Sequence, residues 1–358
     1  MISMQTDTVL AKAAEFDARG DHDEAVNVLA RATQAGDHTA GTHLGKRLLV
    51  GDRAPYLPRE GAGFIMEAAQ AGISEAVALV AVFQGIGIFQ PRDWQLALNS
   101  LAHAASLGYI PAREQLVLLA NAGDPAEDNS LLDNPDAGYW SLYPARIDLD
   151  YWLSSPVGTV LNEDPLIKSF PDFLPQPVCR RLIRLSVKRL APALVYDAVN
   201  KSNYQSPTRT NSIAEFNLVE NDLVNFLIQE RMSAACGVPM VQMEGTAILN
   251  YKPGQEISDH YDFVSPDLPD YQREIAENGQ RIITFLVYLN DDYDDGDTVF
   301  PKLGVSHKGR AGEGLFFTNA LAGGDPDMRS LHTGTPPRNG EKWIVSQFIR
   351  NRTVKYIL

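Results

Sequence analysis

Two histidines, an aspartate and a lysine are the residues of this 358-residue chain whose types and spacing could do chemistry. His260 and Asp262 stand two positions apart, His332 lies farther along, and Lys342 follows ten residues after His332. Two imidazoles and one carboxylate on one face of a metal leave positions open for a cosubstrate and oxygen, as in non-haem Fe(II) oxygenases. These residues therefore predict an iron site, and Lys342 offers a cation for an anionic cosubstrate.

The first two of these residues follow a pattern typical of a strand and a turn. Residues 247–251 form a mostly apolar run, and the turn-forming residues 252–255 come directly after it. In an extended segment, residues two apart point to the same face. We therefore expect His260 and Asp262 to share a face.

The lysine opens a second apolar run. Residues 342–349 follow a turn at 336–340 and have the composition of a buried strand. Lys342 at the start of that strand needs an anionic partner, because an unpaired buried ammonium is costly. A carboxylate of a bound ligand would supply one.

A third run, residues 281–290, is rich in β-branched and aromatic residues and ends at an acidic turn, residues 291–297. Together these segments form an ordered set of motifs: Tyr251…Gly254-Gln255…His260-x-Asp262, Arg281…Thr284…Tyr288-Leu289-Asn290, Thr298-x-Phe300-Pro301, Ser330-Leu331-His332-x-Gly334 and Gly340-x-Lys342-Trp343. The set resembles the prolyl 4-hydroxylase branch of the 2-oxoglutarate/Fe(II) dioxygenases. The resemblance covers roughly residues 165 to 358.

The resemblance implies a fold and a ligand set. The fold would be a double-stranded β-helix, a distorted jelly roll with the metal inside one mouth. His260, Asp262 and His332 match the iron ligands, and Lys342 matches the residue that pairs with the distal carboxylate of 2-oxoglutarate. The implied cofactors are Fe(II), 2-oxoglutarate as cosubstrate and O2, with ascorbate as a candidate reductant.

The resemblance also assigns residues beside the metal. Three positions match residues that hydrogen-bond to the cosubstrate or line its site: Tyr288, Thr298 and Tyr251. Three others match the substrate side: Arg281, which is also our candidate catalytic residue outside the metal site, Phe348 and Arg350.

The implied reaction is hydroxylation of an unactivated C–H bond, with succinate and CO2 as co-products. Asp262 favours hydroxylation over halogenation, because halogenating relatives lack this carboxylate. The chain departs from the family pattern at three places: Ile257 where an aromatic is frequent, Asp295-Gly296-Asp297 where Gly-Gly is usual, and Phe348 where many relatives have tryptophan. The first choice of substrate is a prolyl residue in a peptide or protein. The alternatives are a free amino acid or small metabolite, and a non-catalytic binding scaffold or sensor.

The first third of the chain repeats with a period of 36 residues. The repeated triplets are Ala32-Gly36-Ala40, Ala68-Gly72-Ala76 and Ala104-Gly108-Ala112. Fixed periods of this size are typical of helical arrays, in which small residues let helices pack closely. The pattern resembles the SEL-like group of the tetratricopeptide superfamily, with the glycine at the turn between helices. Such arrays present concave surfaces, so this part is either a platform for a peptide or protein substrate or a structural extension.

These observations divide the chain into three parts. Residues 1–120 form the helical repeat domain, residues 121–164 a connector, and residues 165–358 the oxygenase domain with backing helices. The aromatic content of the connector predicts that it packs against one domain or both. Overall, the predicted fold class is α+β multidomain. The polar segment 267–279, which follows the metal ligands, is a candidate lid.

Composition limits the partners. A net charge of −14 disfavours nucleic acid and anionic membranes, because phosphate would be repelled. The two cysteines, Cys179 and Cys236, indicate that disulfides do not organise the fold and favour a reducing compartment. With no signal-peptide pattern and no long apolar run, we expect a cytoplasmic protein. The sequence leaves the oligomeric state open.

Overall fold

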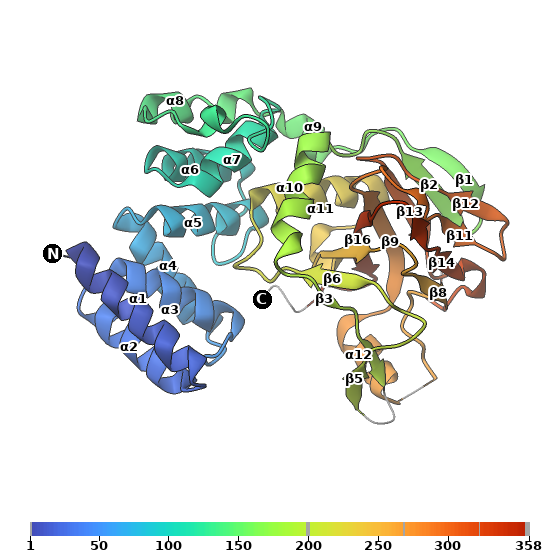
Figure 1. The fold of residues 1–358 in the computed structure, drawn as a ribbon, viewed down its shortest axis with the longest axis horizontal. Coiled ribbons are helices and arrows are strands. Elements are labelled where there is room, and N and C mark those ends of the chain that lie inside the picture. The colour runs from blue at the N-terminus through green and yellow to red at the C-terminus, as the bar shows by residue number, and fades with distance from the viewer. Residues whose placement is uncertain (1, 198–200, 268, 322, 355–358) are drawn as a thin grey trace. The chain divides into compact units, whose positions relative to one another are not determined.

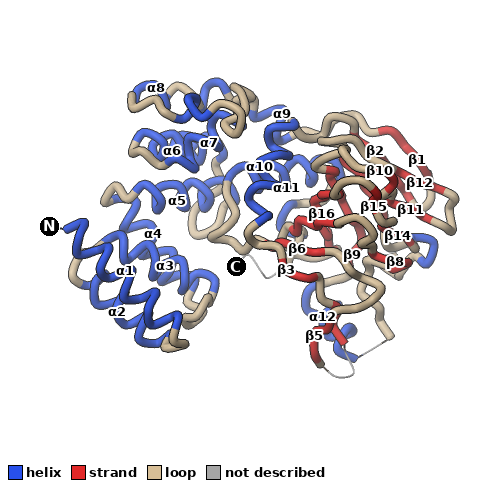
Figure 2. The backbone as a smooth tube through the Cα atoms, in the orientation of Figure 1, coloured by secondary structure: helices blue, strands red, loops and turns tan. Residues whose placement is uncertain are grey.

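A computed structural model describes residues 2–197, 201–267, 269–321 and 323–354 of the chain. The chain divides into two compact units. Among the described residues, the first comprises residues 2–149 and 217–227, and the second comprises those between 150 and 216 and between 228 and 354. The first unit is helical and the second contains the β-sheets (Figure 2).

The first unit begins with a succession of helices (Figure 1). They are α1 (Ile2–Ala18), α2 (His22–Gln34), α3 (His38–Val50), α4 (Pro58–Gln70), α5 (Ser74–Ile86), α6 (Trp94–Ser106) and α7 (Ile110–Leu119). Helices α2, α4 and α6 begin 36 residues apart, as do α3, α5 and α7. Gly36, Gly72 and Gly108 lie at the turns inside these pairs with φ of 90°, 84° and 91°, a region that favours glycine. The predicted helical array is confirmed, and its assignment to the SEL-like group stays a prediction.

Small residues let these helices approach closely. A Cβ atom on Gly45 of α3 would lie 2.7 Å from the carbonyl oxygen of Gly61 of α4, and a Cβ on Gly61 would lie 2.6 Å from that of Gly45. Only glycine fits at such a backbone contact. Ala25, Ala40 and Ala68 are fully buried, so the same device recurs along the array.

The segment after α7 packs through its aromatic residues. Trp140 in α8 (Ala137–Ser141) is fully buried and stacks on Tyr143 with ring centroids 5.2 Å apart. Trp152 in α9 (Leu149–Leu153) is also buried, and it belongs to the second unit. The domain boundaries at residues 120 and 164 stay a prediction.

The second unit holds two main sheets. Its strands are β1 (Thr159–Glu163), β2 (Leu166–Phe170), β3 (Ala191–Pro192), β4 (Val195–Asp197), β5 (Ser202–Tyr204), β6 (Ser212–Glu215), β7 (Ala247–Tyr251), β8 (Ile257–His260), β9 (Arg281–Tyr288), β10 (Asp294–Asp295), β11 (Thr298–Phe300), β12 (Val305–His307), β13 (Gly314–Thr318), β14 (His332–Gly334), β15 (Pro337–Arg338) and β16 (Lys342–Arg350). The larger sheet has the order β1-β2-β13-β9-β16-β7-β6-β3, and the smaller has β12-β11-β14-β8. Two further two-stranded sheets, β4–β5 and β10–β15, are separate.

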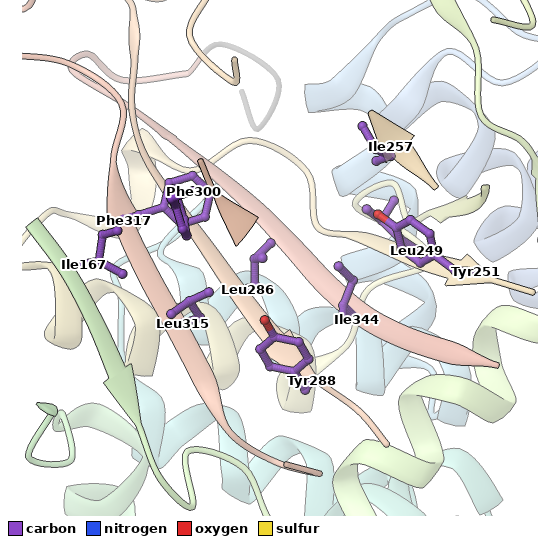
Figure 3. Packing of buried hydrophobic residues seen from close by; sticks show 10 residues of the cluster. All are labelled: Ile167, Leu249, Tyr251, Ile257, Leu286, Tyr288, Phe300, Leu315, Phe317 and Ile344. Atoms are coloured by element: carbon purple, nitrogen blue, oxygen red, sulfur yellow. The ribbon is translucent and has the colours of Figure 1, made fainter. Parts of the chain in front are cut away.

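From β7 onward the chain passes back and forth between these sheets. Strands β7, β9, β13 and β16 lie in the larger sheet, and β8, β11, β12 and β14 lie in the smaller one. This succession is a double-stranded β-helix, or jelly roll, and it confirms the predicted fold class. The core between the sheets takes side chains from both, including Ile257 and Phe300 from the smaller sheet and Leu286 and Leu315 from the larger (Figure 3).

Helices complete the second unit. Helix α10 (Gln176–Val187) packs against β6 and β7. Helix α11 (Leu223–Cys236) begins in the first unit and ends in the second. Helix α12 (Pro269–Asn278) occupies the segment that we predicted as a candidate lid. Within the described part of the chain, no helix is both long and apolar enough to span a membrane.

Candidate iron and cosubstrate site

Two neighbouring strands bring the histidines together. His260 ends β8, His332 begins β14, and the two residues face each other in the antiparallel register. Their ring centroids lie 4.2 Å apart. Asp262, two residues beyond His260, completes the group, and one ligand atom from each of the three residues lies within 4.8 Å of the others. Residues far apart in the sequence thus converge as the spacing predicted.

The two imidazoles are oriented by their own strands. His260 donates from Nδ1 to the carbonyl oxygen of Ser258 at 2.9 Å, and His332 donates from Nδ1 to the carbonyl oxygen of Ser330 at 3.0 Å. Each contact leaves Nε2 free, and these Nε2 atoms lie 3.5 and 3.3 Å from the carboxylate oxygens of Asp262. A backbone carbonyl on the other ring nitrogen is the usual way to fix a metal-binding tautomer.

The electrostatics of the group fit a divalent cation. Burial would raise the pKa of Asp262, but the two histidines outweigh burial and hold it well below its usual value. Burial also opposes the charged form of His332, yet the Asp262 carboxylate and the Ser330 carbonyl raise its pKa. The carboxylate thus favours the protonated form of His332. Two nitrogens and one ionised carboxylate around a common point match the donor set of non-haem Fe(II) sites.

A buried relay holds the second oxygen of the aspartate. The amide nitrogen of Asn319 can only donate, and it donates to Oγ1 of Thr284 at 2.8 Å. Thr284 therefore uses its single hydrogen on Oδ2 of Asp262, at 2.7 Å. Thr284 and Asn319 are both fully buried. The relay fixes the carboxylate and leaves Oδ1 as the less constrained oxygen.

Lys342 lies inside the barrel, where β16 begins. Its side chain is fully buried, and Nζ donates to the carbonyl oxygen of Gly296 at 2.6 Å. The rings of Tyr251 and Tyr288 lie 5.3 and 5.5 Å from Nζ. Burial lowers the pKa of Lys342 to about 7, and the Asp297 carboxylate only partly offsets this. An anionic ligand beside Nζ would stabilise the ammonium.

The predicted cosubstrate residues surround this lysine. Tyr288 and Thr298 join through their hydroxyls at 2.9 Å, and burial raises the pKa of Tyr288. Tyr251 pairs with Lys342 in the β7–β16 register, and burial raises its pKa as well. Both phenols are therefore neutral hydrogen-bonding groups at physiological pH. Tyr251 and Thr298 line the cavity described next, whereas Tyr288 contributes to the packed wall behind it.

The three candidate metal ligands lie at a cavity of about 670 Å³ inside the barrel. Alternate residues of the central strands line it, because residues two apart share a face. The lining residues on these strands are Ala247, Leu249 and Tyr251 of β7 and Lys342, Ile344, Ser346 and Phe348 of β16. His260, Asp262 and His332 also line it. One continuous space thus reaches from Lys342 past the metal ligands to Phe348.

The three substrate-side candidates have different positions. Arg281 and Phe348 line the cavity, and the guanidinium lies 3.9 Å from the Phe348 ring centroid. Arg350 is 1% exposed and is not among the lining residues. Both arginines contact the carboxylate of Glu244, which the sequence analysis did not identify. Glu244 precedes Arg281 by 37 positions and has no local motif around it.

Thr284 was also missed as a site residue, although it belongs to a motif quoted above. Period-two alternation along β9 places Thr284 on the same face as Leu286 and Tyr288. That alternation was a usable signal for a residue directed towards the metal ligands. Asn319 has no such signal, because it follows β13 and reaches Thr284 only through the folded barrel.

The fold and the site together define a class of protein. A jelly roll that holds two histidines, a carboxylate and a buried lysine in one cavity is suited to a mononuclear non-haem iron oxygenase with a dicarboxylate cosubstrate.

Comparison with known proteins agrees with this class. Residues 246–350 match the model of the 2OG-Fe(II) oxygenase superfamily. Probable prolyl 4-hydroxylase 9 of Arabidopsis thaliana is 29% identical over 211 residues, which cover 54% of this chain and 71% of that protein. Prolyl 4-hydroxylase subunit alpha-1 of Rattus norvegicus is 29% identical over 190 residues, covering 53% of this chain and 35% of that subunit. The chain thus carries a 2-oxoglutarate-dependent dioxygenase domain that is similar to the prolyl 4-hydroxylases.

Among solved structures, viral collagen prolyl hydroxylase from Paramecium Bursaria Chlorella virus-1 in its 2OG complex is 26% identical. The alignment covers 51% of this chain and 95% of that one, with a TM-score of 0.41.

Proposed function

We propose that this protein hydroxylates a prolyl residue in a peptide or protein, using Fe(II), 2-oxoglutarate and O2. The observation that carries the proposal is the single cavity that contains Lys342, the three metal ligands and the Arg281–Phe348 pair. Its size is within the range of small-molecule and cofactor sites. The similarity to proteins named as prolyl 4-hydroxylases supports a prolyl substrate.

Different residues of the cavity would bind the metal and the cosubstrate. His260, Asp262 and His332 would hold iron, and iron with 2-oxoglutarate and O2 supplies the oxidation that replaces a C–H bond by C–OH while 2-oxoglutarate becomes succinate and CO2. Lys342 would hold the distal carboxylate of 2-oxoglutarate, with Tyr251 and Thr298 beside it. The apolar walls would exclude bulk water from this end of the cavity.

Arg281 and Phe348 would bound the substrate on the other side. The Arg281 guanidinium donates two hydrogen bonds to Glu244, at 2.7 and 2.8 Å. These bonds fix its orientation, and the Glu244 carboxylate compensates most of its charge. A phenyl ring and a compensated guanidinium suit a neutral, compact group such as a prolyl ring better than an anion.

The first experiment tests the site itself. Apoprotein is titrated anaerobically with Fe(II) and then with 2-oxoglutarate, and the weak visible charge-transfer band of the chelated complex is recorded. A band from the wild type that His332→Ala abolishes supports the iron and cosubstrate roles. Folded, iron-loaded wild type without a band would contradict them.

The second experiment tests the substrate. Succinate release and mass spectrometry of the product are measured with prolyl peptides and, in parallel, with free proline and other amino acids. Peptide-dependent succinate and a mass increase of one oxygen on proline support the proposal. Turnover of a free amino acid alone would replace it by a small-molecule hydroxylase.

We also propose that the protein acts in the cytoplasm and uses ascorbate as its reductant.

We further propose that the helical repeat unit binds part of the peptide substrate. The regular 36-residue spacing of α2, α4 and α6 supports a repeated binding surface. If the repeats bind substrate, lengthening a peptide on either side of the target proline lowers KM well beyond the length that the cavity encloses. KM independent of length would assign the repeats to structure alone.

A further inference from the structure

Helix α12 is attached to the barrel with no buried side chain of its own. A helix normally gains its stability from the burial of one face, so α12 must depend on specific polar contacts. Arg350 supplies two of them. It donates from Nη2 to Oε1 of Glu274 in α12 at 2.5 Å, and from Nη1 to the carbonyl oxygen of Gly279 at 2.6 Å.

Arg350 is itself a buried residue of the second unit. It ends β16, its side chain is 1% exposed, and its Nε donates to Oε1 of Glu244 at 2.6 Å. The same Oε1 atom accepts from Nε of Arg281 at 2.7 Å. One carboxylate is thus shared by an arginine that holds α12 and an arginine that lines the cavity.

The four side chains form a balanced group. Two guanidinium charges, on Arg281 and Arg350, meet two carboxylates, on Glu244 and Glu274. Glu274 is the outermost member, with a third of its side chain exposed. If α12 moved away, Glu274 would leave, and the buried Arg350 would share one carboxylate with the half-buried Arg281. Because a buried charge without a partner is costly, the remaining three residues must rearrange.

A second contact joins α12 to strand β4. Tyr271 of α12 donates its hydroxyl to the carbonyl oxygen of Tyr196 in β4 at 3.4 Å, and the two rings lie 6.4 Å apart. Val195, the neighbour of Tyr196, lines the cavity, as does Asn203 of β5. The helix therefore contacts β16 through Arg350, and it contacts β4, whose Val195 lines the cavity, through Tyr196.

We propose that Glu274 and Arg350 are positioning residues that dock α12 and, through the shared carboxylate of Glu244, fix Arg281 for substrate binding. The link to substrate binding rests on the proposed function, whereas the link between Glu274 and Arg281 does not. Neither Glu274 nor Arg350 touches the cavity. Their effect on substrate is therefore transmitted through Glu244 and Arg281.

The decisive variant is Glu274→Gln, which keeps the shape of the side chain and removes its charge. Glu277→Gln is the matched control, because Glu277 lies on the same helix, is exposed and has the same chemistry. Both changes are at positions where no buried apolar contact is lost. A comparison of the two separates the ion pair from the general charge of α12.

The first readout needs no substrate. Full-length protein is labelled with ¹⁵N-arginine, and the Nε–H signals of Arg281 and Arg350 are assigned by Arg→Lys variants. We expect Glu274→Gln to shift or broaden both signals and to speed amide hydrogen exchange across α12, with Glu277→Gln unchanged from the wild type. An unchanged Arg281 signal beside a shifted Arg350 signal would overturn the transmission. Unchanged exchange in α12 would overturn the docking.

The second readout is kinetic. With a prolyl peptide, we expect Glu274→Gln to raise KM by about fivefold to tenfold with little change in kcat, and to leave the iron and 2-oxoglutarate band unaltered. A general loss of structure would instead weaken the band and lower kcat. A KM equal to that of the wild type would contradict the link to substrate. If the wild type converts no prolyl peptide, the proposed function fails, and the arginine signals still decide the coupling.

Discussion

The charged side chains at the two ends of the cavity are arranged differently: within the part of the chain that the structure covers, a cation at one end has no carboxylate partner, and at the other the cations are paired. At one end Lys342 is fully buried, and among the residues that the structure describes no carboxylate is in ion-pair contact with it. At the other end two arginines meet two glutamates, so the charges cancel. The first end has a cation available for a ligand. The second end uses its charges to hold its own structure.

This difference indicates what each end can bind. A buried ammonium without a counter-ion gains when an anion enters, because the ligand carboxylate replaces lost solvation. A guanidinium already bonded to Glu244 gains much less, and it serves as a rigid surface. We therefore expect a dianionic cosubstrate beside Lys342 and a neutral substrate beside Arg281 and Phe348.

The largest effect is expected from His332→Ala. Loss of one imidazole removes a ligand from the group and leaves Asp262 without the contact that stabilises its charge. We expect the charge-transfer band to disappear and succinate formation to fall to background. The control is His103→Ala, an exposed histidine in α6, which should behave as the wild type. A band that survives His332→Ala would falsify the metal assignment.

Lys342→Met tests the end with the unpaired cation. We expect the affinity for 2-oxoglutarate to fall by about a hundredfold, because a buried charge contact is lost. The free energy of unfolding should rise by about 1 kcal/mol or more, since replacing an uncompensated buried charge by an apolar group is stabilising. Calorimetric titration and denaturant unfolding measure the two effects.

These opposite signs are the distinctive outcome for Lys342. The control is Lys252→Met in the exposed turn after β7, which should change neither quantity. If Lys342→Met lowered stability and left 2-oxoglutarate binding intact, Lys342 would be a structural residue.

Thr284→Val tests the relay behind the metal ligands. The variant keeps the shape of the side chain but removes the hydroxyl that donates to Asp262. We expect metal affinity to fall by about tenfold to a hundredfold, as for other groups that orient a ligand. Mn(II) binding followed by electron paramagnetic resonance measures this without turnover. Thr284→Ser should restore most of the affinity, and Thr333→Val should leave it unchanged.

The smallest effect is a pH dependence of cosubstrate binding. The pKa of Lys342 is lowered to about 7 in the free protein, and a bound carboxylate raises it. Below pH 7 the lysine is protonated in both states, so this group adds no pH dependence to Kd. Above pH 7 binding must take up a proton, and Kd should rise by up to about tenfold per pH unit until the raised pKa is reached.

Calorimetry in two buffers of different ionisation enthalpy detects that proton uptake directly. Lys342→Met, which has no ionisable group at this position, should lose this uptake. A Kd that stays constant from pH 7 to about pH 9 in the wild type would show that the lysine is already charged before the ligand binds.

The residues that the structure brings together at the metal and lysine end could be selected from the sequence, because the information about them is local. His260 and Asp262 are set by an alternation of two, and Lys342 by its place at the start of an apolar strand. The same holds for the helical array, where α2, α4 and α6 repeat the period seen in the alanines and glycines. Short-range periodicity depends only on residues close together in the sequence, so such features can be predicted from a single sequence.

The opposite end could not be predicted in the same way. Nothing near Glu244 in the sequence indicates that it joins Arg281, and Arg350 matched a substrate position although its side chain contacts Glu244, Glu274 and Gly279. Segment 267–279 was polar enough to suggest a mobile lid, yet it contains α12. These contacts depend on partners that only the folded barrel brings together.

The carbonyl contacts of Ser258 and Ser330 have a consequence for handling the protein. Because each imidazole is already oriented by its own backbone, the site requires little rearrangement before it takes an ion. The affinity order of divalent ions places copper, nickel and cobalt above ferrous iron, so affinity alone does not select iron at this site. The metal found in purified protein would then reflect the ions met during growth and purification. Chelation followed by anaerobic reloading is therefore the step on which every activity measurement depends.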